Sequence, residues 1–111
     1  MEVIELMKAL SHETRLRVLH LLVERDGLCV CDLYEVLKLP QPTVSRHLKL
    51  LRDAGLVLDY RENQWVHYKI HHELDSLRKN VLLQVLALAK QEILFNSDIK
   101  RLSEIQLAVC C

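Results

Sequence analysis

The chain has 111 residues, which is enough for one hydrophobic core and too few for two. Half of the residues are hydrophobic and 27% are charged, so the composition favours a folded globular protein and excludes a disordered one. Fifteen basic and fifteen acidic side chains give a net charge of zero, so overall charge does not by itself indicate a nucleic-acid partner. We therefore treat residues 1–111 as a single domain, in which a DNA-binding surface would need local segregation of charge.

No apolar stretch is long enough to span a bilayer, because Lys79, Gln84 and Lys90 interrupt the most hydrophobic region. Acidic residues Glu2 and Glu5 stand where a signal peptide would have a basic region. Four cysteines could form two disulfides in a secreted protein, but without a signal peptide we expect a cytoplasmic protein with reduced thiols and no membrane partner.

Apolar residues at helical spacing predict a series of helices in the first half of the chain. The first covers residues 1–10, and the second is capped by Ser11 and stops at Asp26-Gly27. The third starts near Cys31 or Asp32 and runs to about Lys38. Pro42 suits the first turn of a fourth helix over about residues 41–54. Two helices joined by a short turn, the second rich in small polar and basic residues, predict a helix-turn-helix with a DNA reader helix.

Branched and aromatic residues then predict a β-hairpin over about residues 57–70, which would form a wing. Residues 74–95 are expected to form one long helix that is apolar on more sides than a small domain can cover. We expect this helix and the helix over residues 1–10 to pair with a second copy of the chain. Ser97 or Asp98 would cap a last helix in the C-terminal segment 98–111. The predicted fold is mainly α with a two-stranded β-wing, a homodimeric winged helix-turn-helix.

Cysteines stand at two places, Cys29 with Cys31 before the third helix and Cys110 with Cys111 at the chain end. Residues two apart inside a helix point in different directions, so Cys29 and Cys31 could share an ion only by straddling a helix start. A helix N-terminus favours thiolate, and thiolates prefer soft ions. This spacing predicts a metal or metalloid site that would distort the helix supporting the reader. The alternatives are small buried apolar residues at the first pair and surplus thiols at the second.

The candidate DNA contacts lie on the outward face of the reader helix and near the hairpin tip: Gln41, Thr43, Ser45, Arg46, His47, Lys49, Arg61 and Gln64. Short hydroxyls allow close approach to DNA, and arginine can read guanine with two hydrogen bonds. For Arg46 the alternative is a surface salt bridge. His47 also falls on the inward stripe of the helix, so packing competes evenly with DNA contact.

Several runs together resemble the ArsR/SmtB family of bacterial metalloregulators, and most closely its arsenic-responsive repressors. These runs are Leu28-Cys-Val-Cys-Asp-Leu33, Gln41-Pro-Thr-Val-Ser-Arg-His-Leu48, Leu51-Arg-Asp-Ala-Gly-Leu56 and Trp65-Val-His-Tyr68. The resemblance covers about the first two-thirds of the chain. It implies a dimeric repressor of a resistance operon that leaves its double-stranded operator DNA when cysteines bind As(III) or Sb(III).

One position departs from that family's arsenic-binding pattern, which commonly has a third cysteine three positions beyond the second. Here that residue is Tyr34. The resemblance therefore implies either a two-thiolate site or a third sulfur from Cys110 or Cys111, of the same subunit or of the other. Another branch of the family binds zinc on the long dimer helix, but Asp75 has no histidine following it in that helix, so we do not expect that site.

Three other functions are alternatives to a metalloid-responsive repressor. A thiol redox sensor on the same fold would release DNA when its cysteines oxidise. A thiol-rich metal sink would leave the reader helix and wing unexplained. An enzyme is not expected, because the sequence has no nucleophile elbow, phosphate loop or cysteine on a βαβ unit.

Overall fold

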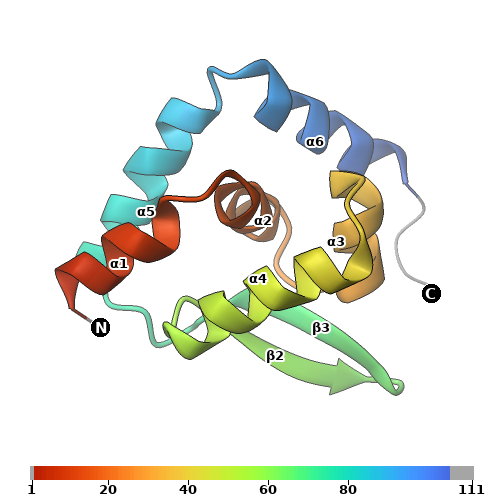
Figure 1. Ribbon diagram of the computed structural model, residues 1–111, viewed down its shortest axis with the longest axis horizontal. Helices are drawn as coiled ribbons and strands as arrows, with labels where there is room; N and C mark the ends of the chain where they lie inside the picture. The colour runs from red at the N-terminus through yellow and green to blue at the C-terminus, as the bar shows by residue number, and fades with distance from the viewer. Residues whose placement is uncertain (1, 106–111) are drawn as a thin grey trace.

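The computed structural model describes residues 2–105. Its elements in chain order are α1 (Val3–Leu10), α2 (Glu13–Glu24), β1 (Leu28–Cys29), α3 (Val30–Leu37), α4 (Gln41–Asp53), β2 (Val57–Glu62), β3 (Trp65–Ile70), α5 (Ser76–Ala89) and α6 (Ile93–Glu104). Helix α2 lies at the centre, the other helices surround it, and the β2–β3 hairpin extends beside α4 (Figure 1). The predicted fold class, mainly helical with a winged helix-turn-helix, is confirmed. No helix in residues 2–105 has the length and apolar character needed to cross a membrane.

The helix-turn-helix consists of α3 and α4, and its core residues follow the spacing expected from the sequence. Val44, Leu48 and Leu51 of α4 are fully buried against the central core. Lys38 ends α3 in the left-handed conformation with φ 57°, and Pro42 occupies the first turn of α4. The short turn between the two helices therefore places α4 with one face on the core and the opposite face toward solvent.

The wing is part of a three-stranded antiparallel sheet in the order β1-β3-β2. The hairpin turn holds Asn63 and Gln64 at φ 51° and 74°, the left-handed conformation that tight hairpin turns require. The short strand β1 was not predicted, because two residues are too few to produce an alternating pattern. It pairs Leu28 with Tyr68 and Cys29 with His67, which connects the segment before α3 to the wing.

The prediction of one long helix over residues 74–95 is wrong. Helix α5 ends at Ala89, and α6 begins at Ile93, before the expected cap at Ser97 or Asp98. The amide of Glu92 donates to the carbonyl of Ala89 at 2.9 Å, which closes a tight turn through a polar run. This turn brings Asp98 to the buried Arg17 of α2. The apolar periodicity of the sequence does not reveal this ion pair.

Two smaller helix boundaries also differ from expectation. Helix α2 is capped by His12, whose Nδ1 accepts from the amide of Thr14 at 3.1 Å, whereas the Ser11 hydroxyl donates back to the carbonyl of Lys8. Helix α3 begins at Val30, one or two residues earlier than the predicted start near Cys31 or Asp32, so that Cys29 is its N-cap residue. The expected C-terminal segment 98–111 belongs to α6 as far as Glu104, and residues 106–111 lie outside the described part of the chain.

Candidate thiol site and nucleic-acid interface

Cys29 and Cys31 straddle the start of α3, which is the arrangement that lets two cysteines of this spacing converge. Cys29 is extended, with φ −66° and ψ 146°, and Cys31 lies in the first helical turn. Their sulfurs are 3.2 Å apart, and the two residues are only 0% and 7% exposed. Bonds between thiolate sulfur and a metal ion such as zinc are about 2.3 Å long, so both sulfurs lie within reach of one ion. Cys31 is disulfide-bonded in this structure. Once it is reduced, the pair can act as two ligands of a soft ion at a helix N-terminus.

No third protein ligand for an ion joins this pair within residues 2–105, where no group of three or more His, Cys, Asp or Glu side chains has a metal-binding arrangement. Tyr34 is half-buried one turn along α3 from Cys31. Cys110 and Cys111, the other predicted ligands, lie outside the described residues. Any third sulfur from this chain must therefore come from the undescribed C-terminal residues.

The far end of α3 is held by charged side chains from two other helices. Arg17 of α2 donates to the carbonyl of Leu37 at 3.0 Å, and Arg101 of α6 donates to the carbonyl of Val36 at 2.6 Å. Both arginines also bind Asp98, which is completely buried. The last carbonyls of a helix lack partners within the helix, so these bonds fix the C-terminal end of α3. A distortion that begins at the cysteines would thus act on a helix whose other end is anchored beside α4.

The predicted DNA-facing residues of α4 divide by burial. Gln41, Arg46 and Lys49 are exposed, and Thr43 and Ser45 are half-buried at the edge of the same face. All five side chains are available from solvent on a helix whose other face packs on the core. This face has hydroxyl, amide and basic groups, the types that contact phosphates and base edges.

His47 differs from these residues, because its side chain is buried and not part of the exposed face. Its ring lies against His12 with 4.3 Å between centroids, and its Nδ1 is 3.2 Å from the Arg15 guanidinium. Burial, followed by the nearby charges of His12 and Arg15, lowers the pKa of His47. This burial favours the packing alternative for His47, between α2 and α4, over contact with DNA.

The wing tip presents Arg61 and Gln64 to solvent, as expected from the sequence. The Arg61 guanidinium donates to the backbone carbonyl of Gln64 at 3.2 Å, so the charge is held across the hairpin turn. An exposed arginine at a wing tip can reach a DNA backbone or a minor groove. Helix α4 and the β2–β3 hairpin lie next to each other (Figure 1).

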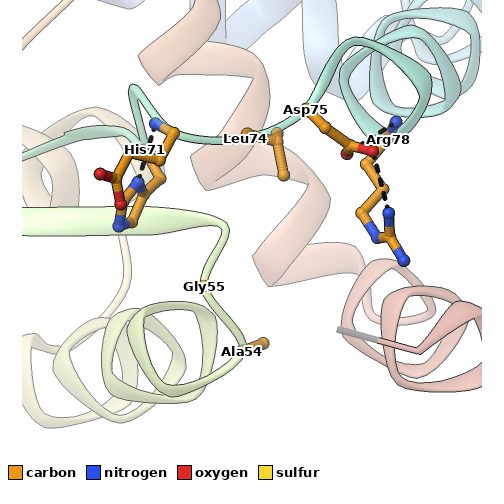
Figure 2. Close-up of a pocket in the computed structure, with 7 residues that line it drawn as sticks. Ala54, Gly55, His71, Leu74, Asp75 and Arg78 are labelled. Carbon is orange, nitrogen blue, oxygen red and sulfur yellow. Dashed lines mark hydrogen bonds and ion pairs between the residues drawn. The ribbon is translucent and has the colours of Figure 1, made fainter.

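A cavity of about 430 Å³ lies between the end of α4 and the start of α5, and Figure 2 shows its lining. Its polar groups interact with one another: the amide of Glu73 donates to His71 at 3.1 Å, and Arg78 pairs with Asp75 at 3.0 Å. Asp75 also caps α5. These residues form the connection from the wing to α5, and their internal pairing gives no indication of a ligand.

Sequence reasoning missed three residues that hold the helix-turn-helix in place. Arg15 binds the carbonyls of Lys8 and Ala9 as well as His47, so it connects α1, α2 and α4. Arg17 and Asp98 form a buried ion pair between α2 and α6. One indication was present, because Arg17 stands inside the apolar run from Leu16 to Leu19, where a charge requires a partner.

Comparison with known proteins decides the family. The pattern of the bacterial regulatory proteins of the arsR family matches residues 12–58, which include the thiol pair and the reader helix. The chain is 52% identical over 79 residues to the arsenical resistance operon repressor of Escherichia coli K12, covering 71% of this chain and 68% of the relative. This chain belongs to the arsR family. It is accordingly a DNA-binding transcriptional regulator and not an enzyme, as the sequence predicted.

Solved structures agree with this arsR-family assignment. The antimony-specific transcriptional repressor AntR matches with a TM-score of 0.67 and 34% identity, covering 80% of this chain and 78% of that one. A homodimeric winged helix-turn-helix DNA-binding domain of Mycobacterium bovis matches with the same TM-score and 26% identity, covering 80% of this chain and 79% of that one.

Proposed function

We propose that this arsR-family protein is a metalloid-responsive transcriptional repressor. As a homodimer it binds double-stranded operator DNA, and it is released when As(III) or Sb(III) is bound by the thiolates of Cys29 and Cys31. The observation that carries the proposal is the 3.2 Å separation of the two buried sulfurs at the start of α3. The relatives named for arsenical resistance and for antimony specificity support a trivalent metalloid as the inducer. Operator binding would place the protein in the cytoplasm.

Release follows from the position of the thiols within the helix-turn-helix. An ion bound to both sulfurs fixes the N-cap residue and the first turn of α3 in one geometry. Because α3 is anchored at its other end and packs directly on α4, the strain is transmitted to the reader helix. The ion can shift the equilibrium toward the DNA-free protein only to the extent that it binds the DNA-free protein more tightly than the DNA-bound protein.

A third thiolate from Cys110 or Cys111 would complete the three-sulfur coordination implied by the family resemblance. Helix α6 leads toward these residues, and its Arg101 donates to the carbonyl of Val36 in α3. This contact brings the end of the last described helix against the helix that bears the thiol pair. Arsenic-edge X-ray absorption would count the sulfurs directly: three in the native chain and two in Cys110→Ser, Cys111→Ser support the terminal ligand. Two sulfurs in both proteins would show a two-thiolate site.

Homodimer formation is supported by apolar side chains left exposed on the outer surface of α1 and α5. We call this set the α1/α5 face: Val3, Ile4, Met7, Leu77 and Val81. A groove of about 200 Å³ runs between the two helices and includes Val3, Leu77 and Val81 in its lining. Two-fold pairing through this face would place two reader helices about 34 Å apart, the spacing of successive major grooves.

The inducer is identified by titrating candidate ions into the complex of the full chain with its promoter DNA. Release by As(III) or Sb(III), with Cd(II) and Zn(II) weaker, supports the metalloid repressor. Release by peroxide alone would instead identify the redox sensor. Stable operator binding in the presence of both metalloids would contradict the proposal.

A further inference from the structure

Three residues form a row across the sheet and connect the thiol pair to the wing. Cys29 of β1 is paired with His67 of β3, and His67 is paired with Tyr60 of β2. Residues directly opposite each other on neighbouring antiparallel strands have side chains on the same face. We call Cys29, His67 and Tyr60 the cross-strand row.

The two wing members of the cross-strand row are in direct contact. The rings of Tyr60 and His67 stack with 5.4 Å between centroids and an interplanar angle of 25°. His67 Nδ1 lies 3.1 Å from the carbonyl oxygen of Trp65, the first residue of β3. The His67 side chain is only 12% exposed, so its position is fixed by its neighbours. A displacement of β1 would therefore be passed to both strands of the hairpin.

A second contact joins the wing to the turn that leads into β1. Gly27 has φ +88°, and a methyl group added there would overlap with the Tyr60 hydroxyl. The hydroxyl thus packs directly on the backbone two residues before Cys29. Glycine is required here for its left-handed conformation and for this close approach. Tyr60 consequently touches the cysteine segment by a route independent of the strand pairing.

We propose that the cross-strand row couples ion binding at the thiol site to the position of the wing, in addition to the position of the reader helix. His67 and Tyr60 are the positioning residues of this coupling. The inference rests on the proposed function, because it requires an ion at Cys29 and Cys31. When both sulfurs bind one ion, the backbone at Cys29 shifts, and β1 carries the shift to β3 through the ladder and to Tyr60 through Gly27. Arg61 follows Tyr60 directly, so the wing tip changes its position relative to DNA as the reader helix does.

The single tryptophan of the chain provides a readout for the wing alone. Trp65 is at the start of β3 and is 42% exposed, so its fluorescence reports on the hairpin. Arsenite titrated into the reduced, DNA-free full chain should change Trp65 emission and saturate at the stoichiometry measured by arsenic content after gel filtration. Cys29→Ser should abolish the change.

Variants of the cross-strand row then separate the response of the wing from arsenite binding itself. Tyr60→Ala and His67→Ala should bind arsenite with native stoichiometry, lose most of the Trp65 response, and need roughly fivefold more arsenite to release operator. Tyr60→Phe keeps the ring stack but loses the hydroxyl contact with Gly27, so it should recover part of the response. Glu73→Gln, at an exposed position just beyond β3 and outside the row, is the control and should behave like the native chain.

The outcomes distinguish this inference from the proposed function. If arsenite releases operator through the cysteines but leaves Trp65 emission unchanged, the wing does not respond to the thiol site. The proposed repressor function would then be unaffected. A full Trp65 response in both alanine variants would also overturn the role of the row. If arsenite does not release operator at all, the proposed function and this inference fall together.

Discussion

Arg17 on α2 and Asp98 on α6 face each other in a two-point ion pair, with nitrogen–oxygen distances of 2.8 and 2.9 Å. Both side chains are almost entirely buried. The hydrogen bond to Asp98 raises the pKa of Arg17 above its ordinary value, so the guanidinium remains charged. The pair fixes α6 against α2 and, through Arg17, the end of α3.

Breaking this pair should destabilise the protein strongly. Asp98→Ala leaves a buried guanidinium without its counter-charge, and we expect a loss of roughly 3–5 kcal/mol in the free energy of unfolding. Urea denaturation measures the loss. The control is Asp59→Asn, which removes an exposed pair with Arg52 and should cost less than about 1 kcal/mol. Equal effects of the two substitutions would show that the buried pair does not fix α6.

Two arginines should affect DNA binding in different ways. Arg46→Ala on the reader helix should weaken operator binding roughly tenfold and relax sequence preference, because it removes a candidate base contact. Arg61→Ala at the wing tip should weaken all duplexes similarly and reduce the salt slope by about one per subunit. Fluorescence anisotropy at several salt concentrations measures both effects. Lys100→Ala on α6, an exposed residue that loses the same charge, is the control. Unchanged affinity in both arginine variants would place the DNA surface elsewhere.

Dimerisation should depend on the α1/α5 face. Leu77 is 74% exposed on α5, so a charge there would be buried unpaired in a dimer interface. Leu77→Glu should therefore give monomers at micromolar concentration in sedimentation velocity, whereas Leu77→Met should remain dimeric. A native chain that is monomeric and still binds operator would exclude this interface.

Acid should destabilise the fold partly through His20. This buried ring packs edge-on against Phe95 with 5.7 Å between centroids, and its Nδ1 has no hydrogen-bond partner within residues 2–105. Burial, with a smaller effect from Lys90, lowers the pKa of His20 in the folded chain. The unfolded chain binds the proton near pH 6.5, so stability is present above about pH 6.5 and falls as the pH decreases below it.

The variant His20→Leu should remove this part of the acid sensitivity. It also removes an unsatisfied buried nitrogen, so we expect the variant to be at least as stable as the native chain at about pH 7.5. At about pH 5.5 its stability should exceed that of the native chain by a larger amount. Urea midpoints at the two pH values test this. His72→Gln, at an exposed position, is the control. An advantage of equal size at both pH values would contradict the role assigned to His20.

The parts of the fold with local sequence patterns were predictable, and the parts that depend on long-range pairing were not. The Pro42 start of α4 and the aromatic hairpin both follow from local spacing and turn residues. The polar run between Ala89 and Ile93 did not by itself predict that the helix breaks there, and the pairing of Asp98 with Arg17 joins residues 81 positions apart. Strand β1 exists only because β3 offers a free edge to Cys29.

The candidate site shows the same division. The convergence of Cys29 and Cys31 was predictable because it depends on a helix start within three residues. The orientation of His47, toward DNA or toward the core, was not predictable, because its position on α4 fits both the outward polar face and the inward apolar stripe. Its contacts with His12 and Arg15 come from a different helix, and only the packed structure shows them.

The most direct test of the central claim is the release of labelled operator by As(III), followed by fluorescence anisotropy, in the native chain and in Cys29→Ser, Cys31→Ser. Serine is a poor ligand for soft ions and a good N-cap, so the double variant should fold and bind operator. We predict that As(III) releases the native chain and leaves the double variant bound. Full release of the double variant by As(III) would contradict the claim that these two thiols are the inducer site.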